Sequence, residues 1–447
     1  MKENYCKETT PCPPIPDVYE NSMAYLTSLV CMGAKEKLGN YSAEEVSNRV
    51  CLELDIIEKK GWADHFLFLK DAVDSARKNL DVCLPGPGRN TQACSLVNYL
   101  LGITQINPLA FDLPFERFAN QALKTSPDIG MEVDSDSYDD FISMMKNKYG
   151  ARMASMAMPY KHKDGTITER VSGFLWAFAD TDLCKIMPMK EVFDDVRTEN
   201  VLCPNVDIRH IAEYGAKVIT ISGTKELSII SRILDEPGID ILNADKQAFL
   251  DSISLDDEST LDLFRRGDTD GIMRFESKGV REHLRNIEPN SFSELTAIDA
   301  MYRPWIVGQL PEYTRRKKSG KNIEYALPEM ASVLDETYGL LIYQEQIIRL
   351  AQILGDMTPE EANELRLAIN RQSGEESYNT FLPMFIKGAR GNGYSPELLK
   401  GIFHSWWEYG AHTFLKSHSL CTTLLSYQTA YLKVHYPKEF NAVMRDL

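Results

Sequence analysis

The sequence lacks long apolar runs, paired cysteines and internal repeats, and each absence excludes a class of protein. No run of about 18 apolar residues occurs, so a membrane-spanning helix is not expected. The nine cysteines form no CxxC pair and no cysteine–histidine group with zinc spacing, which predicts reduced thiols and a cytoplasmic location. The first 17 residues carry no apolar signal core and are expected to form a flexible leader.

Basic charge is scarce relative to acidic charge. The chain has 49 lysines and arginines against 65 aspartates and glutamates, a formal net charge of −16. Such a chain does not coat nucleic acid non-specifically, although a local basic cleft is compatible with it. The clearest basic segment is Tyr313–Lys321, YTRRKKSGK. A solvated loop and a phosphate contact are both open readings of this segment.

What is present is an ordinary globular composition, with 43% hydrophobic residues, in a chain of 447 residues that has room for two to four domains. Apolar spacing predicts a mixed α/β first half and a helical second half. Strands are expected around residues 124–133 and at Ala216–Ile221, and a hairpin is expected to turn at Asp164–Gly165. The expected helices are Tyr19–Lys37, Ala43–Lys60, Ser137–Tyr149, Lys225–Leu234, Leu255–Arg266, Ser277–Ile287, Ser291–Met301, Leu340–Leu354, Pro359–Asn370, Ser395–Tyr409 and Thr422–His435.

Two stretches of the first half predict a phosphate and metal site. Gly86–Thr104, GPGRNTQACSLVNYLLGIT, is a glycine-bracketed loop that opens a predicted helix. Ser126–Asp136, SPDIGMEVDSD, places carboxylates on and after a predicted strand. Backbone amides at such a loop can hold a phosphate, and carboxylates can hold the metal ions that neutralise it. The pairing is typical of nucleotidyl transfer, whereas the loop alone is a weak signal that suits a plain helix N-terminus slightly better than a phosphate site.

Several longer stretches carry a family resemblance. They include NPLAFDLPFERFAN from Asn107, LDETYGLLIYQEQIIRLAQILGDMTPEEANELRLAI from Leu334, and FLKSHSLCTTLLSYQTAYLKVHYPKEFNAVM from Phe414. Together with the glycine loop, they resemble the C-family bacterial replicative DNA polymerase, the DNA polymerase III α subunit, over about residues 20–145 and 205–447. The resemblance implies a truncated palm, thumb and fingers core in which the family's N-terminal PHP domain and C-terminal parts are not recognisable.

The resemblance also implies an architecture. We expect an α+β protein with a polymerase-β-like palm built on a small mixed sheet, a reduced thumb and mainly α-helical fingers. The implied division is 1–142 for N-terminal helices and the first part of the palm, 143–204 for a reduced thumb-like insertion, 205–235 for the second part of the palm, and 236–447 for helical fingers.

The family uses three aspartates to hold two Mg²⁺ ions, and this chain keeps one of them at the matching positions. The first is Asp128, the second position is Gly130, and the third matches Thr220 on an adjacent strand. Glycine offers no ligand, and a threonine hydroxyl is a poor Mg²⁺ ligand without neighbouring carboxylates. Glu132 shares a strand face with Asp128 but lies one pleat repeat, roughly 7 Å, farther along. It is therefore only a possible compensating ligand.

The phosphate loop is altered as well. Where the family has glycine–serine pairs, this chain has Asn90-Thr91 and Cys94-Ser95. Glycine takes positive φ freely and asparagine sometimes does, whereas cysteine rarely does. The loop residues that match the family and are expected to approach the nucleotide are Gly86, Gly88, Arg89 and Ser95.

The fingers positions match the family better. The residues that the resemblance assigns to phosphate or DNA contacts are Arg366, Arg371, Lys416, Ser417 and His418. An alternative reading makes Tyr343 and His418 polar groups packed in the core.

Three functions follow as hypotheses. The first is a degenerate polymerase core, a pseudo-enzyme that binds primer–template DNA, another polymerase or a replisome subunit without adding nucleotides. The second is an active, Mg²⁺-dependent DNA-directed DNA polymerase with rearranged metal ligands. The third is a protein–protein regulator that mimics a polymerase. Gly130 and Thr220 favour the first hypothesis over the second, and no membrane partner is expected.

Overall fold

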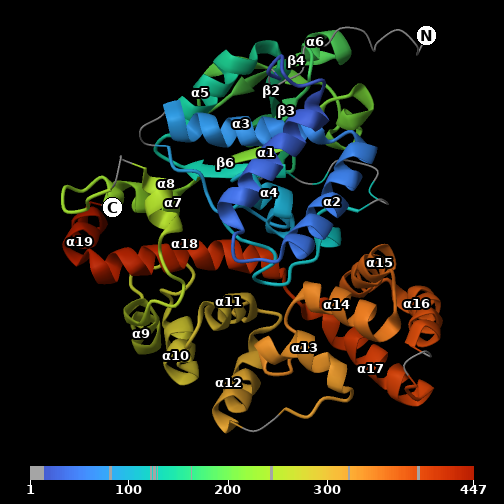
Figure 1. The fold of residues 1–447 in the computed structure, drawn as a ribbon. Coiled ribbons are helices and arrows are strands. Elements are labelled where there is room, and N and C mark those ends of the chain that lie inside the picture. The colour runs from blue at the N-terminus through green and yellow to red at the C-terminus, as the bar shows by residue number, and fades with distance from the viewer. Residues whose placement is uncertain are drawn as a thin grey trace. The chain divides into compact units, whose positions relative to one another are not determined.

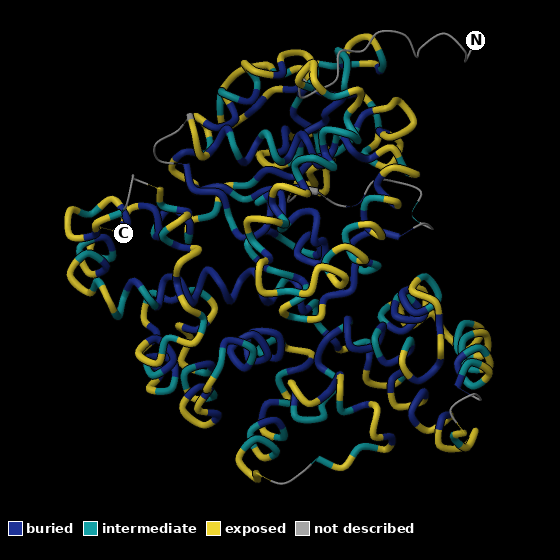
Figure 2. Tube along the Cα trace, in the orientation of Figure 1, coloured by how far each residue is buried: buried dark blue, intermediate teal, exposed yellow. Residues whose placement is uncertain are grey.

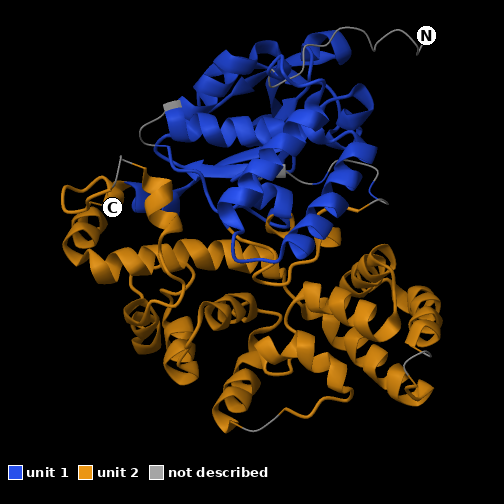
Figure 3. Cartoon of the chain, in the orientation of Figure 1, with its two compact units in different colours: residues 1–92, 96–105, 123–231 blue, residues 93–95, 106–122, 232–447 orange. Residues whose placement is uncertain are grey.

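The computed structural model describes residues 15–79, 83–120, 123, 127, 129–162, 164–241, 245–320, 323–389 and 393–446. The chain forms two compact units, coloured separately in Figure 3. The first contains residues 1–92, 96–105 and 123–231, and the second contains residues 93–95, 106–122 and 232–447. Each unit is described by itself. Along the described chain, no helix combines the length and apolarity needed to cross a bilayer.

The first unit combines helices with two small sheets (Figure 1). Its α-helices are α1 (Ser22–Lys37), α2 (Ala43–Lys60), α3 (Ala63–Asn79), α4 (Leu96–Leu100), α5 (Tyr138–Tyr149), α6 (Leu183–Ile186) and most of α7 (Lys225–Leu234), whose residues from Arg232 onward belong to the second unit. Its strands are β1 (Ile129–Asp134), β2 (Met153–Lys161), β3 (Ile167–Phe178), β4 (Met189–Asp194), β5 (Glu199–Pro204) and β6 (Lys217–Thr224). The α+β class predicted from the sequence is confirmed.

Four strands of this unit form one mixed sheet in the order β1-β6-β3-β2. Strands β1 and β6 are parallel, whereas β3 runs antiparallel to both β6 and β2. The predicted hairpin is confirmed, since β2 and β3 pair and Gly165 in their turn has a φ of 88°. These two strands come from the range assigned to a thumb-like insertion, yet they continue the sheet of β1 and β6. Strands β4 and β5 form a separate two-stranded sheet.

The glycine loop is attached to the edge of this sheet. Residue Pro85 pairs with Val133 of β1 in an isolated antiparallel bridge, and the Gly86 N–H donates to the Glu132 carbonyl at 2.8 Å. The edge of β1 is therefore covered by the loop, which satisfies backbone groups that would otherwise need water or another strand. The glycine loop and strand β1 are thus held in one register.

The second unit is helical in the described chain from Lys246 onward, as the sequence predicts. Its α-helices are α8 (Lys246–Asp251), α9 (Glu258–Arg266), α10 (Lys278–Ile287), α11 (Phe292–Met301), α12 (Leu310–Ser319), α13 (Ala331–Leu334), α14 (Gln344–Gly355), α15 (Pro359–Asn370), α16 (Gly374–Ala389), α17 (Pro396–Tyr409), α18 (Lys416–His435) and α19 (Pro437–Arg445). The long α18 packs against α9 and α11.

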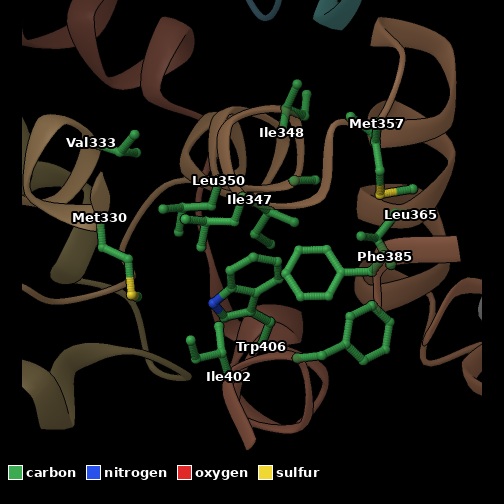
Figure 4. Close-up of a cluster of buried hydrophobic side chains, with 14 of the residues drawn as sticks. Met330, Val333, Ile347, Ile348, Leu350, Met357, Leu365, Phe385, Ile402 and Trp406 are labelled. Atoms are coloured by element: carbon green, nitrogen blue, oxygen red, sulfur yellow. The ribbon is translucent and has the colours of Figure 1, made fainter. Parts of the chain in front are cut away.

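Helices α13 to α17 surround an apolar core (Figure 4). Trp406 and Phe385 lie at its centre with their ring centroids 5.1 Å apart in an edge-to-face arrangement, a favourable geometry for aromatic pairs. Figure 2 shows the inward sides of these helices as buried and their outer sides as exposed. This core fixes the positions of α15, α16 and α17, which carry the residues discussed below.

Several helices differ from the sequence prediction: α16 was not expected, α9 and α14 begin later than expected, and the start of α18 and the whole of α12 also differ. Helix α18 begins at Lys416 rather than at Thr422, because the Glu345 carboxylate accepts hydrogen bonds from the Lys416 and Ser417 N–H groups at its start. The solvated-loop reading of the basic segment is wrong for residues 313–319, which belong to α12. A proline in the first turn, where the missing N–H has no intrahelical partner to lose, favours the start of this helix.

Candidate functional site

The positions of the second and third family aspartates lie opposite each other in the first unit. Gly130 of β1 is the register partner of Thr220 of β6. This confirms that the two positions occupy adjacent strands. Thr220 is buried, with 9% of its surface exposed. The first position, Asp128, lies outside the described residues, so the structure assigns no contact to it.

Gly130 is held where no side chain fits. A Cβ atom built on it would lie 2.4 Å from the Thr220 carbonyl oxygen and 2.9 Å from the Thr220 Cβ. It would also lie 3.2 Å from the Cδ of Arg89. The first contact is with backbone, so it cannot be relieved by a rotamer change and requires the two strands to move apart. The strand pair is therefore built around the absence of a side chain at this position.

The side chain of Arg89 lies beside Gly130. Its Nη1 donates to the Oγ of Ser222 on β6 at 3.2 Å and lies 4.0 Å from the Glu132 carboxylate. Glu132, the possible compensating ligand, therefore faces a guanidinium group. A fixed positive charge next to a carboxylate competes with any cation for that ligand. The arrangement suits an ion pair better than a Mg²⁺ site.

Gln92, which the sequence analysis did not single out, closes the phosphate loop. Its Oε1 accepts from the Arg89 N–H at 3.3 Å, and its Nε2 donates to the Gly130 carbonyl at 2.8 Å. Gln92 is 1% exposed. One loop amide is thereby satisfied from within the loop. The available signal was a long amide side chain between Thr91 and Ala93, in a loop otherwise rich in small residues.

The loop backbone has positive φ angles at a glycine and at an asparagine. Gly88 has a φ of 111°, and Asn90 has a φ of 47° in the left-handed region that asparagine tolerates. Farther along, Ser95 is fully buried just before α4. The N–H groups of Leu96 and Val97 donate to the two oxygens of buried Glu53 at 2.8 and 3.0 Å.

The predicted role of this helix N-terminus as a phosphate cradle meets two obstacles. Helix α4 spans only Leu96–Leu100, and a short helix has a weak dipole. Its first amides already have a carboxylate partner in Glu53, which Arg49 in turn pairs at 2.7 Å. An incoming phosphate would have to displace a buried carboxylate.

The remaining carboxylate on this strand face has a structural role. Asp134 ends β1, is fully buried, and accepts hydrogen bonds from the N–H groups of Leu84 and Ser137 at 3.0 and 2.9 Å. In the part of the chain that the structure describes, no group of three or more His, Cys, Asp or Glu side chains could hold a metal ion. The described residues of the first unit do not fit a two-metal site.

The second unit contains a cluster of arginines that form no ion pair with a carboxylate of the described residues. Arg366 of α15 is 4% exposed and bonds only amide oxygens, those of Asn363, Asn370 and Gln344, at 2.8 to 3.4 Å. Its pKa is lowered, first by burial and then by Arg117 and Arg371, although neighbouring Glu345 opposes this shift. A buried cation with neutral partners is costly unless an anion approaches it.

Arg117 belongs to the same cluster, and the sequence analysis did not identify it. Its Nη2 donates to the Oε1 of Gln344 at 3.0 Å, the atom that Arg366 also contacts. The Nε of Arg117 is buried without a hydrogen-bond partner. Arg371, at the end of α15, forms no ion pair with a side chain of the described residues. The signal for Arg117 was present in the sequence FERFAN, inside the segment that carries the family resemblance.

The other residues that the resemblance assigns to DNA contacts have partners within the protein. The Nζ of Lys416 bonds both oxygens of Glu336 at 2.7 and 2.8 Å and the Phe111 carbonyl at 2.7 Å. The Oγ of Ser417 donates to Glu345 at 3.3 Å. His418 is half-buried, with its ring 5.9 Å from that of Phe414. The structure therefore brings Arg366 and Arg371 together with Arg117, but directs Lys416 and Ser417 to carboxylates.

The basic segment is neutralised on α12. Arg315 and Arg316 both bond the Glu312 carboxylate, at 2.6 and 2.7 Å. Their proximity lowers the pKa of Glu312 to about 2. Lys317 pairs with Glu294 at 2.7 Å, and Lys318 lies 3.6 Å from Glu288. The four consecutive cations therefore each have a carboxylate neighbour, which weakens the reading of this segment as a phosphate contact.

Two family models of the same bacterial protein, the DNA polymerase III alpha subunit, match this chain. A family model described as the bacterial DNA polymerase III alpha NTPase domain matches residues 24–220, and one described as the bacterial DNA polymerase III alpha subunit finger domain matches residues 226–393. The chain is 29% identical to the DNA polymerase III subunit alpha of Halalkalibacterium halodurans, over 94% of the chain and 43% of the relative.

Two further relatives agree with these matches. The chain is 28% identical to the protein of the same name from Aquifex aeolicus, over 94% of the chain and 43% of the relative. It is 29% identical to that of Staphylococcus aureus (strain COL), over 95% of the chain and 44% of the relative. The chain thus spans less than half the length of the curated relatives it matches.

Proposed function

Because the chain belongs to the family of bacterial DNA polymerase III alpha subunits, we propose that it is a polymerase core that binds DNA without adding nucleotides. In this proposal the first unit is a palm whose metal site is closed, and the second unit is a set of fingers that retains an anion site. The partners are primer–template DNA and another polymerase or replisome subunit, in the cytoplasm. Mg²⁺ is not required for binding.

The close approach of β1 and β6 at Gly130, called the pinch below, carries the proposal. Two-metal catalysis needs several oxygen ligands in a small space, so that both the attacking and leaving oxygens are stabilised. A carboxylate at residue 130 would have to overlap the Thr220 carbonyl, which lies 2.4 Å from the position of its Cβ. Arg89 adds a positive charge beside the same position. The local geometry at residue 130 therefore leaves no room for an aspartate side chain unless the two strands move apart.

The arginine cluster supports the binding part of the proposal. Arg117 and Arg366 share a neutral amide partner in Gln344, and the Nε of Arg117 is buried without a partner. Guanidinium groups form their strongest hydrogen bonds with phosphate and carboxylate oxygens, often through two parallel N–H donors. A phosphate group of bound DNA, or of a nucleotide, would satisfy these donors and offset the buried positive charge.

An active polymerase with Glu132 as a replacement ligand is the competing function. It requires Glu132 to exchange the Arg89 guanidinium at 4.0 Å for a metal ion, with Asp128 as the partner carboxylate. A primer-extension assay with the full chain separates the two functions. It should be run with Mg²⁺ and then with Mn²⁺, which relaxes geometric demands on the ligands. We expect no template-dependent extension, and extension that Asp128→Ala abolishes would contradict the proposal.

A DNA-binding measurement separates the proposal from a protein–protein regulator. Fluorescence anisotropy of a labelled primer–template duplex, titrated with the chain at several salt concentrations, reports both affinity and the number of phosphate contacts. Binding that weakens steadily with salt supports a DNA groove. Undetectable or salt-insensitive binding would contradict it and favour the regulator.

A further inference from the structure

The second unit contains a groove that shares no lining residue with the Gly130 region or the arginine cluster. It lies between α16 and α17, has a volume of about 760 Å³, and is mainly apolar. It is lined by Gly374, Glu375, Tyr378, Asn379, Glu397, Lys400, Gly401, His404 and Trp407. The volume is within the range of small-ligand and side-chain pockets, about 300–1,000 Å³.

Aromatic rings form one wall of the groove. The Tyr378 ring stands perpendicular to Trp407, with centroids 5.3 Å apart, and perpendicular to His404 at 6.2 Å. Trp406 and Trp407 are consecutive on α17, so the helix points them in different directions. Trp406 fills the core shown in Figure 4, whereas Trp407 is half-buried and lines the groove.

Two glycines of the groove lie beside open space. A Cβ atom added at Gly374 or at Gly401 would meet nothing within 4 Å. Gly374 also has a φ of 82°, which disfavours a side chain there. The space beside the aromatic rings is therefore free of neighbouring protein atoms at both positions.

Three charged residues of the groove form no ion pair within the described chain, whereas His404 of the lining lies 3.3 Å from the Glu408 carboxylate. Glu375 and Glu397 line it together with Lys400, and none of the three forms an ion pair with another side chain of the described residues. Both glutamates lie in the first turns of their helices, where a negative charge favours the helix dipole. The interaction with the helix dipole explains why a glutamate is favourable at each helix start. It does not explain why both glutamates lie beside an aromatic groove. The lining carries two carboxylates against one ammonium group.

We propose that this groove binds an arginine or lysine side chain from a basic segment of a partner protein. A cation placed against the Trp407 and Tyr378 rings, which line the groove, gains from the ring quadrupoles, and the glutamate carboxylates add charge attraction. The aliphatic stem of the side chain suits the apolar wall. The same carboxylates repel a phosphate backbone, so the groove favours a basic peptide over nucleic acid.

The test uses the full chain labelled with 5-fluorotryptophan, which has five reporter positions, and fluorine NMR. The probe is the peptide Ac-GRLRG-amide, compared with Ac-GELEG-amide and with a short oligothymidylate. Trp407→Phe assigns the groove signal. We expect the basic peptide to shift the Trp407 signal and the other two probes to leave it in place. The combined Glu375→Gln and Glu397→Gln variant should raise the dissociation constant by about threefold or more.

Two controls keep the result decisive. Trp305, which is 52% exposed elsewhere in the same unit, provides a matched reporter whose signal should not move with the peptide. The glutamine variants change no volume, and unchanged thermal unfolding would show that they fold. A shift of equal size with the acidic peptide or the oligothymidylate would overturn the proposal. So would an unshifted Trp407 signal when the basic peptide is present in large excess.

Discussion

The Gly130 region of the first unit and the arginine cluster of the second unit differ in the charges that surround their guanidinium groups. In the first, Gln92 satisfies a loop amide, Glu53 satisfies the amides of α4, and Arg89 lies 4.0 Å from the Glu132 carboxylate, although the Nε of Arg89 has no hydrogen-bond partner among the described residues. In the second, Arg366 has amide oxygens as its hydrogen-bond partners, and within the described chain neither Arg366 nor Arg117 forms an ion pair with a carboxylate. A cation that already has a carboxylate neighbour gains less from an anionic ligand than a buried cation with neutral partners.

The largest effect is expected from adding a side chain at the pinch. Gly130→Ala should lower the free energy of unfolding by about 1–3 kcal/mol, because its Cβ overlaps the Thr220 carbonyl. Gly173→Ala is the matched control, since Gly173 belongs to β3 of the same sheet and a Cβ there meets nothing within 4 Å. Calorimetric unfolding of the two variants measures the difference. Equal stability of both would show that the strands can open.

The next largest effect is expected at the arginine cluster. Arg366→Gln should weaken primer–template binding about tenfold, because a charge-assisted hydrogen bond contributes roughly 1.5–3 kcal/mol. Arg117→Gln should act in the same direction, since both side chains contact Gln344. Anisotropy titrations measure the change, with circular dichroism to confirm folding. Unaltered affinity in both variants would remove the cluster from the DNA interface.

A smaller effect is expected when the loop loses its internal partner. Gln92→Ala leaves the Gly130 carbonyl and the Arg89 N–H without this partner, at a cost of about 1 kcal/mol. It should not create primer extension, because the pinch at Gly130 remains. Gln352→Ala, at a half-buried glutamine of α14, is the control. Nucleotide incorporation by the Gln92 variant would mean that the loop alone blocks catalysis.

The smallest effect is expected from the basic segment of α12. Combined Arg315→Gln and Lys318→Gln should change DNA affinity by less than about twofold, because both cations already have carboxylate neighbours and surface pairs contribute little. The slope of log affinity against log salt should stay the same in this variant. In Arg366→Gln the slope should become shallower by about 0.9, the value for one lost phosphate contact. A shallower slope in the α12 variant would make this segment part of the interface.

Local signals were readable from the sequence. Ser42 and Gly61 bound α2 as an N-cap and a left-handed C-cap, and Asp164–Gly165 marks the turn of the hairpin. Each depends on residues within a few positions of one another, where backbone preferences decide the outcome. The family resemblance added that Thr220 lies on a strand adjacent to that of Gly130, and the structure added the register that pairs them.

Long-range contacts were not readable in the same way. Arg117 and Arg366 meet through Gln344 only because the chain folds back on itself. Lys416 was expected at phosphate but bonds Glu336, and composition does not indicate which carboxylate will lie nearby. The pinch at Gly130 depends on a strand separation that no motif encodes. Such features are set by packing between distant segments, which local preference does not determine.

The central claim is that the palm does not assemble a two-metal site, and Mn²⁺ binding tests it most directly. Electron paramagnetic resonance of Mn²⁺ should be recorded with the full chain, a dideoxy-terminated primer–template and a non-hydrolysable nucleotide. The account predicts no bound Mn²⁺ beyond the ion that the nucleotide itself carries, and the same spectrum for Asp128→Ala. Two tightly bound Mn²⁺ ions per chain, lost in Asp128→Ala, would contradict it.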